Sequence, residues 1–456
     1  MARLHPLSGF PEWLPQGREV ERHLIRTLRR VFTLHGFVEI ETRAVEPLGD
    51  LLRKGETSKE VYVLRRLQDA DRTGYDAKTL GLRFDLTVPL ARYVLENAGQ
   101  LDFPFKRYQI QKVWRGERPQ EGRFREFLQA DLDVIGLGQL PFHYEVELPL
   151  VMAEALTAMG IGGFKVRVNN RKVAEGVYQG IGLGPEQAEV ALRWVDKLDK
   201  IGPAGVAAGL AGEGLSDEQC QVTLSLAAIS GDDPAAVACA VRELAGVAGA
   251  GNASLEEGLA ELTALLDAGQ RRLPGVLTAD LKIARGLDYY TGSVYETVWL
   301  GQESLGSVCS GGRYDSLATA GSQTYPGVGL SIGVSRLVSR VLALGLLAPS
   351  RLSPAAVLVA VVDEPSRAAS DTIASQLRAR GIPTDVAPVA AKFGKQLKYA
   401  DRRGIPFVWF PAGGDGLQDQ VKDIRSGEQV DAAAATWTPP AADLRVGFVR
   451  AGELDH

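Results

Sequence analysis

Arginine and carboxylate side chains occur in this chain at spacings that suit the binding of a charged small molecule. Arg115, Glu117 and Arg123 lie in the stretch "RGERPQEGRFREF", and Asp133 follows on the same run. Arginine grips planar carboxylate and phosphate groups through paired hydrogen bonds, and few lysines accompany these arginines. An aspartate suits an ammonium group or an imidazole instead. The pattern favours a site for a carboxylate or phosphate ligand, with the aspartates available for a basic group.

Three polar clusters of this kind occur along the sequence. Arg83, Asp85 and Thr87 stand at alternate positions of a predicted strand. Taken one at a time, each cluster is also typical of a solvated sheet face or a surface ion pair, most of which do nothing specific. Taken together, they favour one binding site built from separate strands. The clusters are Arg83, Asp85 and Thr87; Arg115, Glu117, Arg123, Gln129 and Asp133; and Arg285, Tyr290, Tyr314 and Arg336.

The third cluster begins in "ARGLDYYTG", residues 284–292, which runs into the strand-like "SVYETVWL". Adjacent residues on a strand point to opposite faces of the sheet. Tyr289 and Tyr290 therefore cannot both serve one surface. We expect one of them to pack in the core and the other to face a ligand.

A β-hairpin is needed to position the second cluster. Residues 105–136 read as two strands joined by a polar loop around residues 118–124. Side chains alternate between the two faces of a strand, so the second strand has one apolar and one polar face. The apolar face carries Leu128, Ala130, Leu132 and Val134, and the polar face carries Arg125, Phe127, Gln129, Asp131 and Asp133.

The remaining segments differ in pattern. Residues 16–35 and 144–160 have helical spacing of apolar side chains. Residues 165–275 are rich in Ala and Gly, helical in pattern and poor in chemically active side chains. From about residue 355 strand and helix alternate, which predicts a separate domain with a parallel sheet covered by helices. A chain of 456 residues has room for about two to four domains.

The composition is that of a soluble globular protein, with 45% hydrophobic and 23% charged residues. The first residues lack the apolar core of a signal peptide, and no run approaches the length of a membrane span. Three cysteines without metal-ligand spacing make a disulfide framework unexpected, which favours a cytoplasmic location. The net charge of −5 argues against a protein that coats nucleic acid, although it allows local basic faces.

Several segments together resemble the class II aminoacyl-tRNA synthetases, and specifically the histidyl-tRNA synthetases. "PLGDLL", with Pro47 in its expected place, "RGERPQEGRFREFLQADLDVIG" and "GVGLSIGVSRL" are similar to the three class motifs. "ARGLDYYTG" and "SGGRYD" resemble the two signatures of the histidine-specific branch, and the C-terminal "GKQLKYADRRGIPFV" resembles its anticodon-binding domain. The chain departs from the pattern at Asp133, where many bacterial relatives carry glutamate, and at "GFPEWLP" near the N-terminus.

The resemblance implies an α+β fold, with an antiparallel-sheet class II catalytic core, a helical insertion and a C-terminal α/β anticodon-binding domain. The implied activity is that of a histidine–tRNA ligase, which forms histidyl-adenylate and pyrophosphate from histidine and ATP and then transfers histidine to the 3′ end of tRNA(His). Mg²⁺ and a homodimer are implied as well. The implied domains are the first part of the core at 1–164, the insertion at 165–275, the second part of the core at 276–350 and the anticodon-binding domain at 355–456.

The resemblance also implies roles for the polar clusters. Arg285 is similar to the catalytic arginine of the histidine branch, where a fixed guanidinium stabilises charge that builds on the α-phosphoryl oxygens. Tyr290 would then face histidine, with Tyr289 packed behind it. The implied ATP-binding residues are Arg115, Glu117, Arg123, Phe127 and Arg336; the histidine-binding residues are Asp85, Thr87, Arg115, Gln129, Asp133, Arg285, Tyr290 and Tyr314; and the tRNA-binding residues are Arg118, Gln120, Lys395, Lys398 and Arg402, with Lys392 and Arg403 beside them.

Two other classes of protein share parts of this resemblance. A paralogue serves as the histidine-binding regulatory subunit of ATP phosphoribosyltransferase, and it usually lacks the C-terminal domain and parts of the ATP-binding set, which this chain retains. A synthetase-like sensor of uncharged tRNA would normally be fused to a kinase, and no kinase motif occurs in this sequence. For the basic stretch in the last domain, a solvated helix face is the simple alternative to an RNA contact.

Overall fold

The charged hairpin predicted from the sequence belongs to the main sheet of the molecule. The structure, a computed structural model, describes residues 7–52, 60–69, 74–76, 78–249, 251–284, 289–316, 318–412 and 418–450. In it, β5 (Phe105–Trp114) pairs antiparallel with β6 (Glu126–Ile135). The prediction of two strands joined by a polar loop is confirmed.

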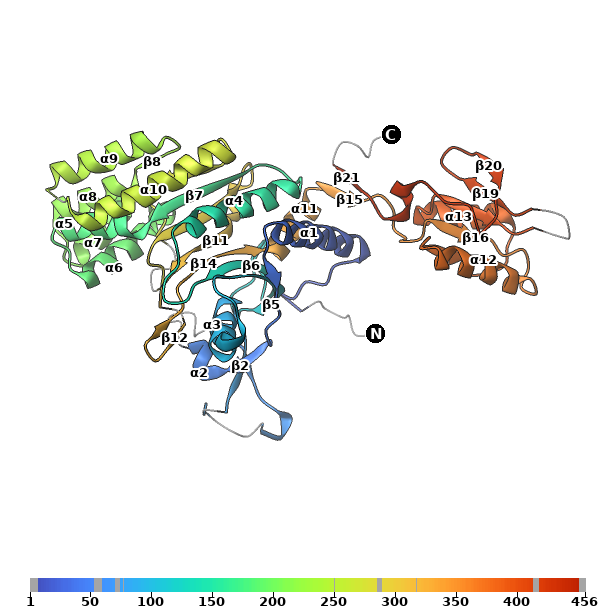
Figure 1. Cartoon of the computed structure of the whole chain (residues 1–456), viewed down its shortest axis with the longest axis horizontal. Helices are drawn as coiled ribbons and strands as arrows, with labels where there is room; N and C mark the ends of the chain where they lie inside the picture. The colour runs from blue at the N-terminus through green and yellow to red at the C-terminus, as the bar shows by residue number, and fades with distance from the viewer. Residues whose placement is uncertain are drawn as a thin grey trace. The chain divides into compact units, whose positions relative to one another are not determined.

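The main sheet has nine strands in the order β1-β5-β6-β14-β11-β10-β7-β9-β8 (Figure 1). Its pairings are antiparallel except for β1 with β5 and β7 with β9. This largely antiparallel sheet, together with the helices around it, confirms the predicted α+β fold class. The other strands are β1 (Val38–Glu39), β7 (Phe164–Asn170), β8 (Ser230–Gly231), β9 (Leu277–Asp280), β10 (Ser293–Trp299), β11 (Ser307–Tyr314) and β14 (Gly327–Gly333).

The two faces of β6 differ in chemistry, as the alternation predicted. Ala130, Leu132 and Val134 are fully buried in the apolar core, whereas Gln129 and Asp131 point to the polar side and are also buried. Helix α4 (His143–Ala158) packs against β6, β7 and β14. On the polar face, Asp131 and Asp133 are buried, which lowers the local dielectric and makes their charged contacts stronger.

The Ala- and Gly-rich stretch is helical, but not from residue 165. Its first residues form β7, which pairs antiparallel with β10 inside the main sheet. Val166 and Val168 are buried there, because β-branched residues at alternate positions suit a strand with a partner available. Figure 1 shows the following helices gathered at one end of the sheet. These are α5 (Arg171–Gly180), α6 (Pro185–Val195), α7 (Leu198–Gly212), α8 (Asp217–Ala227), α9 (Pro234–Val247) and α10 (Ala253–Arg272).

A small three-stranded sheet in the order β2-β4-β3 precedes the hairpin. Strand β4 ends at Leu82, so the prediction that Arg83, Asp85 and Thr87 alternate along a strand is wrong. Asp85 instead precedes α3 and Thr87 begins it, because the Asp85 Oδ1 atom accepts a hydrogen bond of 3.0 Å from the Val88 N–H in the first turn. The elements are β2 (Val45–Pro47), α2 (Leu48–Leu51), β3 (Val63–Leu64), β4 (Leu80–Leu82) and α3 (Thr87–Asn97).

By contact density the chain divides into two units, Met1–Glu12 with His23–Arg340 and Trp13–Arg22 with Val341–His456. The first unit holds the main sheet. Helices α1 (Pro15–Leu34) and α11 (Val334–Ala343) each have residues in both units. Among the described residues, no helix is both long and apolar enough to cross a membrane.

The second unit contains a five-stranded sheet in the order β17-β16-β18-β19-β20. Its first three strands are parallel, as the strand-helix alternation predicted, and β19 and β20 add to them antiparallel. Val357 and Trp409 pack with α12 on one face, and Leu358 and Val408 pack with α13 on the other. The elements are β16 (Val357–Val359), α12 (Arg367–Ala379), β17 (Thr384–Val386), α13 (Phe393–Arg403), β18 (Phe407–Phe410), β19 (Gln420–Asp423) and β20 (Gln429–Asp431).

Candidate active site

A pocket of about 420 Å³ opens beside the polar face of the hairpin. Its walls come from the hairpin, the start of α3, the segment before β10, and from β11, β14 and α11. The sheet thus brings together residues that lie far apart in the sequence. The predicted site residues that line the pocket are Asp85, Thr87, Arg115, Glu117, Arg123, Phe127, Gln129, Tyr290 and Arg336.

Arg115, directly after β5, is held on the floor of this pocket. Its Nε donates to the Phe84 carbonyl at 3.0 Å, and its Nη2 donates to the Gln129 amide oxygen at 3.4 Å. The guanidinium carbon also lies 5.0 Å from the centre of the Phe127 ring. Burial lowers the pKa of Arg115, and the negative charge of Asp85 raises it in part. An arginine nevertheless stays protonated at neutral pH. The pocket therefore contains a fixed positive charge suited to a phosphate or carboxylate.

The turn of the hairpin forms one rim of the pocket. Glu117 and Arg123 form an ion pair there, and the backbone of Gln120 pairs with that of Arg123. Arg336, on α11, donates from Nε to the Gly122 carbonyl at 3.0 Å, which ties the turn to the third class motif. The planar guanidinium groups of Arg123 and Arg336 therefore lie at the rim of the pocket.

Asp133 and Tyr314 lie in a buried layer next to the pocket wall. The Tyr314 hydroxyl donates to the Asp133 Oδ1 atom at 2.9 Å. Glycines make room for both side chains, because a Cβ on Gly327 would lie 2.4 Å from the Tyr314 ring and one on Gly329 would lie 2.0 Å from Asp133 Oδ1. Burial raises the pKa of Tyr314, so its hydroxyl keeps its proton.

Tyr289 and Tyr290 do not alternate between the faces of a strand. Strand β10 starts only at Ser293, so neither tyrosine lies on it, and both line the pocket. Their ring centres are 4.2 Å apart, and the Tyr290 ring packs against the backbone at Gly312. The expectation that one tyrosine packs in the core while the other faces a ligand is wrong, because both line the pocket and both also pack against a buried core cluster. Arg285 lies outside the described residues.

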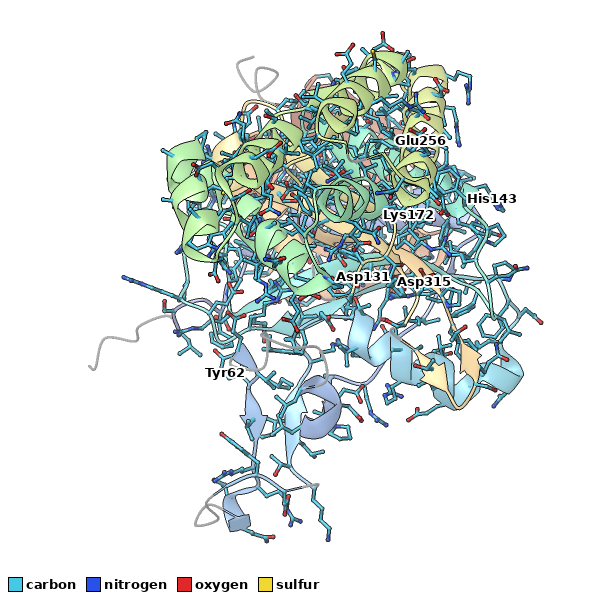
Figure 2. All side chains as sticks on the ribbon, turned by 90° about the vertical axis from the view of Figure 1, so that its left-hand side faces the viewer. Tyr62, Asp131, His143, Lys172, Glu256 and Asp315 are labelled. Atoms are coloured by element: carbon cyan, nitrogen blue, oxygen red, sulfur yellow. The ribbon has the colours of Figure 1, made fainter. Side chains whose placement is uncertain are left out.

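Arg107 and Asp131 are buried beside the pocket, and sequence reasoning gave them no role. Arg107 lies on β5 directly opposite Asp133 on β6, with its Nη2 atom 2.6 Å from Asp133 Oδ2. Asp131 accepts a hydrogen bond of 2.9 Å from the Gln129 amide. It is labelled in Figure 2, in the interior of the first unit. Arg107 could have been predicted from the sequence, because every second residue of the first strand counted back from Arg115 lies on the same face, and Arg107 is one of them.

Burial raises the pKa of Asp131 to about 7, and the charge of Asp133 acts in the same direction. The neighbouring Arg107 charge opposes this shift, as do hydrogen bonds from Ser331 and Gln129. Asp131 is therefore a buried acid that can change its charge near neutral pH.

Lys200 also lines the pocket, although it lies on α7, far from the predicted motifs. The neighbouring Asp199 pairs with Lys282 at 2.9 Å, which holds the start of α7 near the residues that follow β9. The sequence pattern of the helical stretch contains no signal for this contact, because it arises from the packing of separate elements.

The predicted RNA-binding residues are exposed. Arg118 and Gln120 lie on the outer side of the hairpin turn in the first unit. In the second unit, Lys395, Lys398 and Arg402 occupy exposed positions of α13. Their spacing of three and four residues places them along one side of the helix.

Comparison with known proteins identifies the family. A profile described as Histidyl-tRNA synthetase matches residues 9–337, and one described as Anticodon binding domain matches residues 356–432. A histidine–tRNA ligase from Cutibacterium acnes is 56% identical over 462 aligned residues, which cover 98% of this chain and 99% of the relative. The chain belongs to the histidyl-tRNA synthetase family.

Solved structures of histidyl-tRNA synthetases have the same fold. The crystal structure of histidyl-tRNA synthetase from Nostoc sp. PCC 7120 matches with a TM-score of 0.83 and 36% identity, over 95% of this chain and 98% of that one. A Bacillus halodurans structure, titled as an ATP phosphoribosyltransferase regulatory subunit/histidyl-tRNA synthetase, matches with a TM-score of 0.69 at 20% identity, over 86% of this chain and 96% of that one. At that identity the likeness shows the fold alone.

Proposed function

We propose that this member of the histidyl-tRNA synthetase family is an active histidine–tRNA ligase. It joins the carboxylate of histidine to the α-phosphate of ATP, releases pyrophosphate, and passes histidine to the 3′ end of tRNA(His), with release of AMP. The observation that carries the proposal is the single pocket in which Arg115 and Arg123 meet Asp85, Gln129 and Tyr290. Such a pocket offers cationic groups for phosphates and acceptor groups for an ammonium ion side by side.

In the activation step, ATP binds along the hairpin. We assign the adenine ring to the space between Phe127 and Arg336, because a ring and a guanidinium plane both stack on a base. Glu117 lies near the adenine amino group, and Arg123 binds the β- and γ-phosphates. Arg123 pairs with Glu117 in the present structure, so its guanidinium must turn from that carboxylate to the phosphates when ATP arrives.

Histidine lies deeper, with its carboxylate toward Arg115. Arg115 holds this carboxylate and the α-phosphate together, which brings the attacking oxygen near phosphorus. As that oxygen bonds to phosphorus, the bond to the pyrophosphate oxygen breaks. Arg285 is assigned to the α-phosphoryl oxygens by family resemblance, as the group that stabilises their growing negative charge. Asp85, Thr87 and Gln129 receive the α-ammonium group.

The imidazole of histidine is assigned to Tyr290, Tyr314 and Asp133. A neutral imidazole has one donor and one acceptor nitrogen, so a hydroxyl donor and a carboxylate acceptor can read both. Burial raises the pKa of Tyr290, which keeps its hydroxyl available as a donor. Other amino acids of similar size lack this pair of nitrogens and would leave the buried polar groups unsatisfied.

The second step and its partners are proposed from the family and the exposed residues. Arg118 and Gln120 approach the acceptor end of tRNA(His), and Lys395, Lys398 and Arg402 contact its anticodon stem-loop, where unstacked bases can be read. A homodimer and a cytoplasmic location are proposed on family grounds. Mg²⁺ is proposed to arrive bound to the phosphates of ATP. Among the described residues, no group of three or more His, Cys, Asp or Glu side chains could hold a metal ion.

The experiment that tests this proposal is histidine-dependent exchange of labelled pyrophosphate into ATP. The expected result is exchange with histidine and not with other amino acids, abolished in Arg115→Ala. Histidine binding without exchange would instead favour the regulatory-subunit alternative. The match of the anticodon-binding profile to residues 356–432 supports the ligase over that alternative.

A further inference from the structure

We propose that Arg107 is a positioning residue for histidine recognition, which fixes the Asp133 carboxylate beside Tyr314 in the buried layer next to the pocket wall. The inference rests on the proposed function, because it takes Asp133, Tyr290 and Tyr314 to be the groups that read the imidazole. Neither Arg107 nor Asp133 lines the pocket, and Asp133 lies in the layer next to its wall, so Arg107 acts through Asp133 and not by touching histidine.

The geometry places Asp133 between two partners of different kinds. The Arg107 Nη2 atom lies 2.6 Å from its Oδ2 oxygen, and the Tyr314 hydroxyl donates to its Oδ1 oxygen at 2.9 Å. Arg107 comes from β5 and Tyr314 from β11, on opposite sides of β6 in the sheet order. A carboxylate held at each oxygen by a separate strand has a fixed orientation, which a short side chain on a sheet would otherwise lack.

The burial of Arg107 argues against a purely structural role. Its side chain is 0% exposed, and neither its Nε nor its Nη2 atom has a hydrogen-bond partner among the described residues, so its contact with Asp133 is an ion pair by distance. Its closest other contact is a long one of 3.4 Å to the Gln109 amide oxygen. A buried ion pair commonly stabilises a protein no more than apolar side chains of similar volume would. Arg107 makes few hydrogen bonds for a buried cation. Its role is therefore better explained by its positive charge, which stabilises the ionised Asp133 carboxylate.

Asp131 makes that charge more important. Asp131 and Asp133 stand two residues apart on the same face of β6, and both are buried. Two carboxylates this close disfavour each other's ionised form unless a cation lies between them. Gln129 donates to Asp131 and accepts from Arg115, which continues the network to the residue assigned to the histidine carboxylate. Removing Arg107 would leave two buried carboxylates without their nearest cation.

The test compares Arg107→Met and Arg107→Lys with the wild-type chain in the pyrophosphate exchange assay. We expect Arg107→Met to raise KM for histidine about tenfold or more, with KM for ATP within about twofold of wild type. Arg107→Lys keeps the charge and should recover a large part of this loss. The matched control is Arg351→Met, which removes another buried arginine, one that donates to the Ser353 and Asp443 carbonyls in the second unit. It should lower Tm and leave KM for histidine unchanged.

A double variant keeps the test decisive if Arg107→Met folds poorly. Arg107→Met with Asp131→Asn removes one positive and one negative group, so it should bind histidine more tightly than Arg107→Met alone. The proposed role would be overturned if Arg107→Met raised the KM values for histidine and ATP equally or left KM for histidine unchanged. It would also be overturned if neither Arg107→Lys nor the double variant lowered KM for histidine below that of Arg107→Met. Absence of exchange in the wild type would count against the proposed function and is distinguishable from these results.

Discussion

Gly329 and Asp133 are direct partners in the pairing of β14 with β6, and the glycine leaves the space that the carboxylate occupies. A Cβ built on Gly329 would lie 2.0 Å from Asp133 Oδ1, closer than any real contact. On the same strand, Gly327 leaves the corresponding space for the Tyr314 ring. The glycines of "GVG" are thus required by the two side chains that we assign to the imidazole.

Gly329→Ala should therefore damage histidine recognition. The added methyl group must displace Asp133 or the backbone, and overpacking of this kind costs about 1–3 kcal/mol of stability. We expect a lower Tm and a KM for histidine raised more than KM for ATP. Gly246→Ala, on the exposed side of α9 with nothing within 4 Å of the added atom, is the control; it should not lower Tm and should leave both KM values unchanged. A Gly329→Ala enzyme with wild-type KM for histidine would show that the space is not needed.

Arg123→Ala should weaken the binding of ATP. The side chain lies at the pocket rim and is 49% exposed, so its ion pair with Glu117 stabilises the fold by less than about 1 kcal/mol. Loss of a charge-assisted contact to phosphate should raise KM for ATP about tenfold. Steady-state exchange kinetics measure this, with Tm and KM for histidine as internal controls. A rise in KM for histidine alone would contradict the assignment.

Lys200 should add positive charge to the same pocket from α7. We expect Lys200→Met to raise KM for ATP by about threefold to tenfold, because ATP brings several negative charges to a pocket that this cation lines. Lys197→Met is the matched control, since Lys197 lies one turn earlier and packs over the Trp194 ring at 4.1 Å. The two variants behaving alike would mean that Lys200 does not reach the nucleotide.

Asp131 predicts a specific dependence of stability on pH. Burial raises its pKa to about 7, whereas an aspartate in an unfolded chain titrates near about 3.9. Between these values the folded chain binds more protons at this position, so stability falls as the pH rises from about 4 through about 7. Asp131→Asn removes the titration.

The corresponding measurement is the Tm of the wild type and of Asp131→Asn, followed from about pH 5 to about pH 8.5. The variant should gain Tm relative to the wild type as the pH rises, because the wild type must then bury a second charge beside Asp133. Two curves that remain parallel over this range would show that Asp131 does not titrate there.

The exposed basic residues of α13 should affect the transfer of histidine to tRNA(His) without affecting the formation of histidyl-adenylate. Replacement of Lys395, Lys398 and Arg402 by alanine should raise KM for tRNA(His) and weaken its dependence on salt, because contacts to phosphates release counterions. Pyrophosphate exchange should stay at the wild-type level. Arg367→Ala is the control, since Arg367 lies on α12, on the opposite face of the sheet, and pairs with Glu364. An unchanged KM for tRNA(His) in the triple variant would favour a solvated helix face.

The hairpin and the parallel part of the second sheet could be predicted because local patterns decide them. Alternation on β6 identified the polar face with Gln129 and Asp133. The strand-helix alternation after residue 355 likewise predicted the parallel part of the second sheet.

Other features depend on contacts between distant segments. Residues 165–170 read as part of a helical stretch until β10 is known to lie beside them. Tyr289 and Tyr290 precede β10, which begins at Ser293. Because neither tyrosine lies on the strand, the alternation of strand faces does not apply to them. Lys200 lines the pocket from α7, whose start is held by the ion pair of Asp199 with Lys282, just after β9. Arg83, predicted in a polar cluster, is instead buried, and its Nη1 atom donates to the Thr42 carbonyl at 2.8 Å.

The most direct test of the central claim is the charging of tRNA(His) with labelled histidine in the presence of ATP. The proposal predicts acid-precipitable histidine on tRNA(His), absent when ATP is omitted and lost in Arg115→Ala, with no charging by other amino acids. Tight binding of histidine to the wild-type chain without any charging of tRNA(His) would contradict it, and would mean that the pocket binds histidine for another purpose.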